Sequence, residues 1–242
     1  MEKELIGKGR ISKVYKVNGD AIKTFPEDYP IAWIVYEVNL QNEIYQHTQL
    51  PVIKYRYEEG SRDIKMPFLD GIELTTRMIR DKYKGGLDDL IQLQLSIYQY
   101  KGLNLSNAHD DYPKRLMDSD LDDAIKKIAL EAFQTIEKKD VLCHFDFHFS
   151  NIMYVNHQYI IIDWVNAKLA NPILDVARTY VILKQYLKRS ANKYLRNMAK
   201  HLEIERLSFE PAIKVMAALR MLEPDTKERM KVLDDLVFGQ QK

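Results

Sequence analysis

The sequence HFDFHFSN at residues 144–151 decides the fold of this 242-residue chain, together with IIIDW at residues 160–164. The first stretch contains the pattern H-x-D-x-x-x-x-N, and the second is an apolar run that ends in an aspartate and a tryptophan. Two β-rich runs between these patterns are separated by Asn-His, which suits a tight turn. We therefore expect a β-hairpin that brings Asn151, at the start of its first strand, close to Asp163, at the end of its second.

These polar residues are the groups that phosphoryl transfer from a nucleotide requires. Asp146 would orient the attacking hydroxyl and accept its proton, while Asn151 and Asp163 would hold Mg²⁺ on the phosphates. The reaction depends mainly on positioning and on neutralisation of charge, so a few oxygen ligands on a stiff frame suffice. The pattern predicts a kinase-type reaction, with Asp146 as the catalytic residue and Asn151 and Asp163 as metal ligands.

A glycine turn and a lysine near the N-terminus predict a site for the phosphates. Gly7 and Gly9 lie between two predicted strands, and without a Cβ they let backbone amides approach phosphate oxygens. Taken alone, this pair is equally well explained as a surface hairpin. Lys23 follows within a short apolar strand, where its ammonium group needs a partner. We interpret all three as nucleotide-binding, over the alternative of an edge-strand lysine that reaches solvent.

Two glutamates on the next predicted helix, residues 31–48, are candidate partners for Lys23. We prefer Glu43, because it lies nearer the helix end that leads into the following strand. Glu37 stays open as the alternative, and a plain solvated surface is the ordinary explanation for either glutamate.

The chain is expected to divide into two lobes at residue 70. Residues 1–70 are rich in predicted strands with one helix, whereas residues 71–242 are mainly helical. At the crossing, adenine would bond to backbone groups near Met66 and Phe68. This predicts an α+β fold with a small nucleotide-binding lobe and a larger catalytic and substrate-binding lobe. In the larger lobe we expect a buried strand at 141–143, loops at 104–113 and 167–172, and helices at 74–83, 87–102, 119–138, 172–190, 194–203, 209–222 and 225–237.

Composition and charge narrow the class of protein. Hydrophobic residues make up 46% of the chain and charged residues 29%, which is typical of a folded soluble protein. The net charge of +1 gives no electrostatic case for nucleic acid or an anionic membrane as partner. No apolar run reaches membrane-spanning length, and the N-terminus lacks a signal-peptide pattern. The single cysteine, Cys143, fits a reducing compartment and a small buried side chain, so we expect a cytoplasmic protein.

The catalytic half of the chain resembles the aminoglycoside phosphotransferase and choline kinase family of small-molecule kinases, which share the protein-kinase-like fold. LCHFDFHFSNI at residues 142–152 is similar to the family's L-C-H-G-D-x-H-x-x-N-I. The family's second pattern, I-D-W … P … D-x-A-R-T, is similar to three further parts of this sequence. These are IIDW at residues 161–164, Pro172, and DVART at residues 175–179. The resemblance implies ATP and Mg²⁺ as cofactors, with GTP left open, and a phosphate clamp formed by Lys23 and a helix glutamate.

The resemblance also implies supporting roles and shows two departures from the family pattern. Asp175 would brace the catalytic loop from the following helix, and His144 and His148 would be structural. Phe145 stands where the family has a glycine, and Ser12 replaces the third glycine of the phosphate loop. Neither departure removes a reacting group, so we expect activity.

The acceptor is expected to be a small molecule that carries a hydroxyl group. Only 12 positions separate Asp163 from Asp175, which leaves little room for a platform that docks a peptide. An aminoglycoside-like or choline-like compound fits this limit. Carboxylates that could meet such a cationic acceptor are Asp110, Asp111, Glu223 and Asp225, although the sequence does not place them near Asp146.

Two other functions compete with this interpretation. A nucleotide-binding regulator, or pseudokinase, is disfavoured because a binder has no need of the complete set of Lys23, Asp146, Asn151 and Asp163. A protein kinase is disfavoured by the short segment after Asp163.

Overall fold

The computed structural model describes residues 3–239 and consists of two compact units. The first unit holds the chain up to Tyr83 together with Phe149–Val165, and the second holds Lys84–His148 and the chain from Asn166 onward. Strands dominate the first unit and helices the second, so the expected α+β class is confirmed. The lobe boundary at residue 70 stays a prediction.

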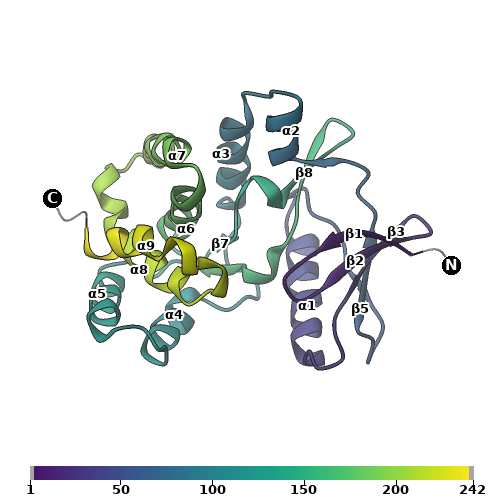
Figure 1. Ribbon diagram of the computed structural model, residues 1–242, viewed down its shortest axis with the longest axis horizontal. Helices are drawn as coiled ribbons and strands as arrows, with labels where there is room; N and C mark the ends of the chain where they lie inside the picture. The colour runs from purple at the N-terminus through teal and green to yellow at the C-terminus, as the bar shows by residue number, and fades with distance from the viewer. Residues whose placement is uncertain (1–2, 240–242) are drawn as a thin grey trace. The chain divides into compact units, whose positions relative to one another are not determined.

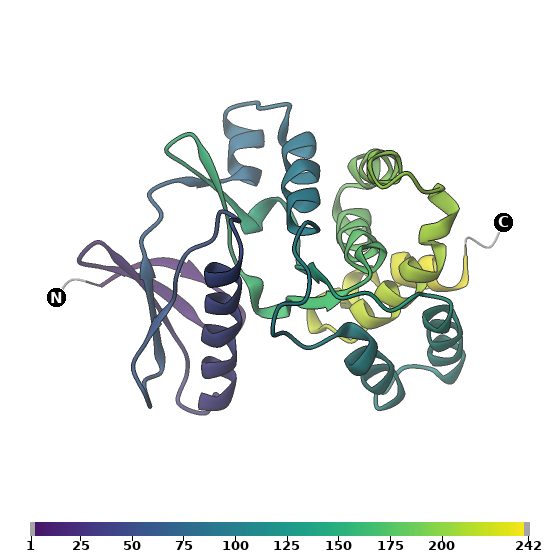
Figure 2. The same cartoon turned by 180° about the vertical axis from the view of Figure 1, so that it is seen from behind.

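The first unit is built on a five-stranded antiparallel sheet with one helix packed against it (Figures 1 and 2). The helix α1 spans Ile31–His47 and starts directly after Pro30. Its apolar side chains Ile34 and Val38 are buried against sheet residues that include Ala21 and Ile64. The strand order is β1-β2-β3-β5-β4, with bounds Glu4–Lys8, Lys13–Val17, Asp20–Thr24, Asp63–Pro67 and Arg56–Tyr57.

A second small sheet in the first unit contains the predicted β-hairpin. Strands β8 (Ile152–Val155) and β9 (Gln158–Ile161) pair directly, and β6 (Ile72–Glu73) adds to β8 ahead of α2 (Leu74–Arg80). Asn156 and His157 form the turn with φ values of 47° and 65°, the two positive angles that a two-residue hairpin turn requires. The hairpin is confirmed, but Asn151 does not open its first strand. It closes a short 3₁₀ turn, Phe149–Asn151, that precedes β8.

The second unit is mainly helical around a two-stranded sheet. Strand β7 (Val141–Cys143), predicted from the sequence, pairs with β10 (Lys168–Ala170), which lies in a region predicted as loop. The α-helices are α3 Gly86–Ile97, α4 Ala108–Met117, α5 Asp123–Gln134, α6 Pro172–Tyr186, α7 Lys188–His201, α8 Glu210–Met221 and α9 Met230–Phe238. The 3₁₀ helices Arg206–Phe209 and Pro224–Arg229 precede α8 and α9, and a further 3₁₀ turn spans Trp164–Asn166.

The prediction of a loop at residues 104–113 is wrong, because α4 starts at Ala108. The side chain of Asn107 caps the helix by accepting a hydrogen bond from the backbone N–H of His109 at 2.9 Å. Ala108, Tyr112 and Leu116 form a buried stripe at helical spacing. The polar residues between them weakened the sequence signal, but these residues only cover the exposed face.

Helix ends also differ from the predicted ranges. The helix predicted at 119–138 is shorter, because Asp122 caps α5 with its side chain. The helix predicted at 172–190 ends at Tyr186, and α7 begins at Lys188 and absorbs most of the helix predicted at 194–203. Across residues 3–239, none of the helices is long and apolar enough to cross a membrane.

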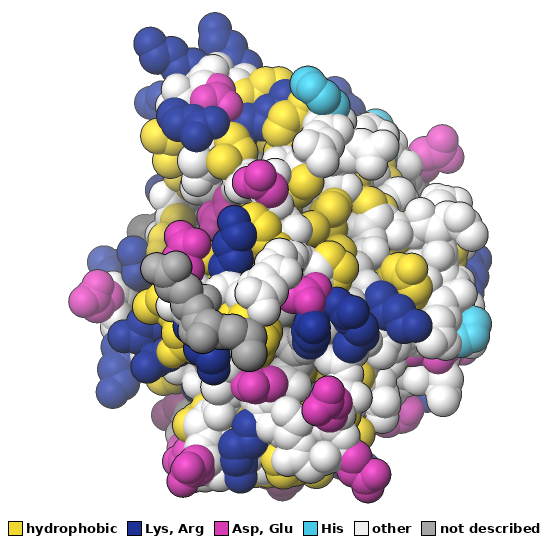
Figure 3. Space-filling view, turned by 90° about the vertical axis from the view of Figure 1, so that its right-hand side faces the viewer, with side chains coloured by type: hydrophobic (Ala, Val, Ile, Leu, Met, Phe, Trp, Pro, Cys, Tyr) yellow, Lys and Arg dark blue, Asp and Glu magenta, His cyan; other side chains and the backbone are white. Residues whose placement is uncertain are grey.

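The surface carries both signs of charge side by side. In the space-filling view of one face, lysine and arginine side chains alternate with acidic and apolar ones (Figure 3). This mixture is what a chain with 36 basic and 35 acidic residues would be expected to present.

Candidate active site

The open end of the β8–β9 hairpin carries Asn151 and Asp163 in the first unit. The backbone N–H of Ile162 donates to the carbonyl of Asn151 at 3.0 Å, one step beyond the Ile152–Ile161 pair of the ladder. Asp163 follows directly and has φ of 63°, a left-handed conformation that aspartate tolerates better than most residues. The hairpin therefore brings the backbones of the two predicted metal ligands together at one end.

Lys23 pairs with Glu37, so the sequence-based preference for Glu43 is wrong. The Lys23 Nζ lies 2.6 Å from Glu37 Oε1, and both side chains are largely buried, with 17% and 7% of their surface exposed. Glu37 lies one turn after Ile34 on the face of α1 that packs against the sheet, which is why it reaches Lys23. Glu43 falls outside that face, and its carboxylate lies 3.3 Å from His47 on the same helix.

The pKa of Glu37 responds to two nearby charges and to burial. Burial raises the pKa of Glu37, the Lys23 ammonium lowers it, and the carboxylate of Asp163 raises it further. The pKa of the buried Tyr55 is also raised, first by burial and then by the charges of Glu37 and Asp163. The charges of Lys23 and Asp163 therefore act in opposite directions on the same buried carboxylate.

The residues at the hairpin end fit a magnesium ion in chemical terms. Asn151 and Asp163 supply the hard oxygen donors that Mg²⁺ prefers, and this ion is usually held by one or two protein groups plus phosphate oxygens and water. Within residues 3–239, no cluster of three His, Cys, Asp or Glu side chains offers an all-protein metal site. A cation held here would therefore complete its shell with phosphate oxygens and water.

The glycine turn is tight, and its side-chain environment does not by itself demand glycine. The Gly9 N–H donates to the Ser12 carbonyl at 2.9 Å, which closes the turn. A Cβ on Gly7 would lie 3.5 Å from Val14, and one on Gly9 would lie 3.4 Å from the Ser12 carbonyl oxygen. The nucleotide-binding roles of Gly7 and Gly9 stay predictions.

The segment expected to contact adenine lies at the end of the sheet. Met66 is buried in β5 and belongs to the core of the first unit. Phe68 follows that strand, and its ring lies 4.0 Å from the Lys16 ammonium. The contacts of Met66 and Phe68 with a nucleotide also stay predictions.

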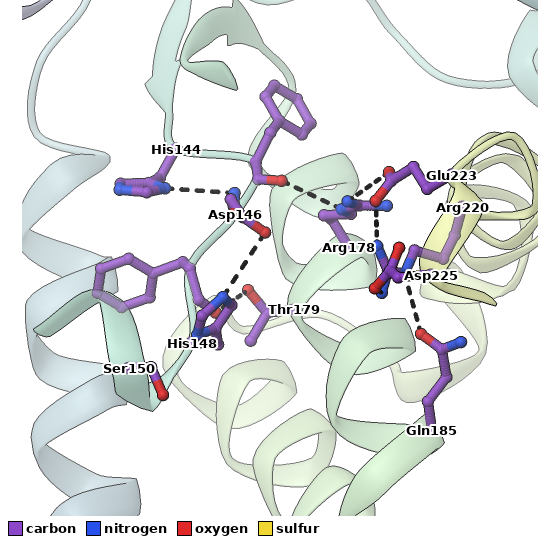
Figure 4. A network of polar contacts seen from close by, with 12 residues as sticks. His144, Asp146, His148, Ser150, Arg178, Thr179, Gln185, Arg220, Glu223 and Asp225 are labelled. Carbon is purple, nitrogen blue, oxygen red and sulfur yellow. Dashed lines mark hydrogen bonds and ion pairs between the residues drawn. The ribbon is translucent and has the colours of Figure 1, made fainter. Parts of the chain in front are cut away.

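Asp146 lies in the second unit, on the loop that follows β7 (Figure 4). Its backbone N–H donates to His144 Nδ1 at 3.2 Å, and the His144 ring is fully buried. Its carboxylate lies 3.8 Å from His148 Nε2 and keeps 24% of the side-chain surface exposed. His144 therefore orders the loop from inside, while the Asp146 carboxylate remains accessible.

Phe145 occupies a backbone conformation that favours glycine, the residue that the family pattern has at this position. Its φ is 60°, and a bulky residue pays roughly 1–2 kcal/mol for this left-handed region. Asp175 Oδ1 accepts the Phe145 N–H at 2.6 Å, and Arg178 Nε donates to the Phe145 carbonyl at 3.1 Å. The ring is buried and meets the Tyr112 ring edge-on at 5.4 Å. These contacts offset the backbone cost.

The helix α6 holds the loop around Asp146 through a buried polar network. Asp175 is fully buried and also accepts hydrogen bonds from Gln94 Nε2 and the Tyr98 hydroxyl, each at 2.9 Å. Thr179 Oγ1 donates to the Phe147 carbonyl at 3.0 Å and accepts from Gln94 Nε2 at 3.1 Å. Asp175, Arg178 and Thr179 have the spacing of one helix face, so α6 contacts the loop with three successive side chains.

Some of these supporting residues were not identified from the sequence. Arg178 and Thr179 stood within the family motif but received no role. Gln94 had no signal, because its partners lie more than 80 residues away in the chain. His109, on α4, has a structural role, since its Nε2 lies 2.9 Å from the Ile136 carbonyl.

The chain belongs to the phosphotransferase enzyme family, whose model matches residues 4–204. No curated protein sequence matches the chain. Among solved structures, it is similar to a thermostable mutant of aminoglycoside phosphotransferase APH(4)-Ia in its apo form. The two share 15% identity, 99% of this chain and 94% of that chain are covered, and the TM-score is 0.67.

Two further solved structures extend the comparison. A ternary complex of the same phosphotransferase with AMP-PNP and hygromycin B has a TM-score of 0.66 at 14% identity, covering 100% of this chain and 95% of that one. Choline kinase LicA from Streptococcus pneumoniae has a TM-score of 0.64 at 12% identity, with 99% and 94% covered. The expected protein-kinase-like fold and the resemblance to this family are confirmed.

Proposed function

We propose that the protein is an ATP-dependent phosphotransferase that moves the γ-phosphate of the nucleotide to a hydroxyl of a small molecule. The observation that carries this proposal is the buried Lys23–Glu37 ion pair, in the same compact unit as the hairpin end that carries Asn151 and Asp163. A phosphate-binding lysine and a metal-binding carboxylate are needed together only where phosphates and a cation are bound together. The family match and the AMP-PNP complex of a structural neighbour support the nucleotide, with GTP as the alternative.

The roles of the residues follow from their chemistry. Lys23, held by Glu37, would neutralise charge on the α- and β-phosphates. Mg²⁺ held by Asn151 and Asp163 would neutralise the charge that develops on the transferred group. Asp146 would accept a hydrogen bond from the acceptor hydroxyl and then its proton. The accessible carboxylate of Asp146 supports its role toward the acceptor, and the buried ring of His144 supports a structural role.

The four carboxylates considered for a cationic acceptor are already paired with cations of this chain. Asp110 lies 3.1 Å from Lys138 Nζ, and Asp111 lies 2.5 Å from Lys168 Nζ. Glu223 and Asp225 pair with arginines. These carboxylates would each have to exchange a partner to bind an aminoglycoside-like or choline-like compound.

Two other aspartates of the second unit are candidates for contact with a cationic acceptor. An open hollow of about 550 Å³ is lined by Asp118 and Asp120, with Arg115, Met221 and Leu222 among its other residues. Within the described part of the chain, neither aspartate takes part in an ion pair.

A thermal-shift titration tests the nucleotide and the acceptor separately. Ligand binding to the native state raises the melting temperature, by about 5–10 °C at a hundredfold excess over Kd for a chain of this size. We expect a magnesium-dependent shift with ATP or GTP, and a further shift with one member of a panel of choline, aminoglycosides and sugar alcohols. Transfer of radiolabelled γ-phosphate to that compound would complete the proof.

Each competing function gives a different result in the same experiment. A nucleotide shift without transfer to any compound would favour the pseudokinase alternative. Robust labelling of a generic protein substrate would favour a protein kinase. No shift with any nucleotide would refute the proposal.

A further inference from the structure

A cluster of alternating charges joins α6 and α8 to the segment that follows α8 (Figure 4). This cluster, which we call the Glu223 cluster, consists of Arg178, Arg220, Glu223 and Asp225. Arg178 Nη2 lies 2.6 Å from Glu223 Oε1, Arg220 pairs with Glu223 Oε2, and Arg220 Nη2 lies 2.6 Å from Asp225 Oδ2. Gln185 Oε1 accepts a further hydrogen bond from Arg220 Nε at 3.0 Å.

The two arginine side chains are buried, whereas the two acidic side chains are more exposed. The side chains of Arg178 and Arg220 expose less than a tenth of their surface, and Asp225 exposes about half. A buried guanidinium is stable only when its charge is paired and its N–H groups have acceptors. Within residues 3–239, Glu223 is the one carboxylate in ion-pair range of Arg178. Glu223 therefore determines where the Arg178 guanidinium rests.

Arg178 connects this cluster to the catalytic loop. Its Nε donates to the Phe145 carbonyl, which belongs to the peptide that links Phe145 to Asp146. Phe145 has a positive φ that phenylalanine does not favour, so this peptide needs an external contact to keep its orientation. Asp175 holds the N–H on the other side of Phe145 and does not restrain the carbonyl. Arg178 therefore restrains the carbonyl of the Phe145–Asp146 peptide, while His144 accepts the N–H of the same peptide.

We propose that Glu223 is a positioning residue for Asp146 and acts through Arg178. The inference rests on the proposed function, because it concerns the residue assigned to the acceptor hydroxyl. Glu223 receives two arginines on its two carboxylate oxygens, which fixes its own position. Loss of its charge would release the Arg178 guanidinium, let the Phe145–Asp146 peptide turn, and displace the Asp146 carboxylate.

Glu223→Gln tests this without a large change in shape, and Glu210→Gln is its matched control. Glu210 lies on the neighbouring helix α8 and, like Glu223, pairs with a cation, Lys214 at 2.9 Å, but its side chain is exposed. Hydrogen exchange of the Phe145 and Asp146 amides measures the loop directly. We expect E223Q to speed exchange there by about tenfold or more, since a charge-assisted contact is lost. E210Q should leave it unchanged, and Glu223→Asp should restore it in part.

Turnover separates positioning from general damage. With water as the acceptor of the γ-phosphate, we expect E223Q to lower kcat about 10- to 100-fold. The Kd of magnesium AMP-PNP, which depends on Lys23, Asn151 and Asp163, should not change. Unchanged exchange in E223Q, or faster exchange with normal kcat, would overturn the inference. If the unsubstituted protein does not turn over ATP, the proposed function fails, and the exchange difference between E223Q and E210Q still reports whether Glu223 holds the loop.

Discussion

The two regions that carry the predicted site residues are held in different ways. In the first unit, Lys23 forms an ion pair with Glu37, and the edge strand β1 of the same sheet is almost entirely exposed. In the second unit, the loop around Asp146 is held by fully buried Asp175 and by further polar side chains behind it. A single ion pair can open and re-form when phosphates arrive, whereas a buried network resists rearrangement. We therefore expect the region around Lys23 to adjust when a nucleotide binds, and the loop around Asp146 to keep the same conformation with and without ligand.

The largest effect is expected from Asp146→Asn. The substitution removes the proton acceptor, and general-base groups contribute about 10²- to 10⁴-fold to rate. Stability should change little, because the Asp146 carboxylate is partly exposed and asparagine has nearly the same shape. Labelled phosphate transfer measures the rate, and urea unfolding measures the stability. Asp235→Asn, on the exposed side of α9, is the control. Full activity in D146N would refute the assigned role.

Asp175→Asn should disrupt the buried network that holds the loop around Asp146, the more rigid of the two regions. It replaces a buried acceptor of three hydrogen bonds with an amide that leaves buried donors unsatisfied. We expect the free energy of unfolding to fall by about 2–4 kcal/mol. Denaturant titration measures this, with Asp235→Asn again as the control. A loss below the error of the method would show that the network does not stabilise the loop.

Glu37→Gln tests the more adaptable region, around Lys23, through the pH dependence of the protein's stability. Burial raises the pKa of Glu37 above its ordinary value of 4.5, so the native state holds this proton more tightly than the unfolded state does. The stability associated with this group is fully present below pH 4.5 and is lost as the pH rises through the raised pKa. In the E37Q variant this position has no group that titrates in the same pH range.

The wild-type protein should therefore lose stability relative to E37Q as the pH rises from about 4 to about 7. Melting temperatures of both proteins across this range measure the difference. The opposite slope would mean that Lys23 outweighs burial. E37Q should also weaken nucleotide binding, because Lys23 loses the group that orients it.

His157→Gly should have the smallest effect on stability. It tests whether a positive φ is more costly in an exposed turn than in the buried loop that contains Phe145. His157 and Phe145 both have positive φ, but His157 is exposed in the β8–β9 turn and Phe145 is buried. Glycine at the second turn position should raise the free energy of unfolding by up to about 1 kcal/mol. Denaturant titration measures it. A decrease would mean that the contact of His157 with the Tyr154 hydroxyl matters more than the backbone strain.

Several features were predictable from the sequence because they depend on neighbouring residues. The hairpin followed from β-rich runs around Asn156 and His157, and strand β7 followed from its apolar residues. The order of polar residues from His144 to Asp163 indicated the family, because the whole motif lies within one short stretch of the chain. The choice between Glu37 and Glu43 was not predictable in this way, since both lie on one helix and only its packing decides which one faces Lys23.

The sequence by itself determined the α+β class, the hairpin and the motif that places the chain in its family, because turn chemistry, hydrophobic pattern and residue order act over short distances. Only the tertiary structure decided the partners of the buried polar groups. Gln94 lies 81 positions from Asp175, and Arg178 lies 45 positions from Glu223. Such pairs form because a buried charge must find a partner wherever the fold brings one near, and no local pattern records that choice.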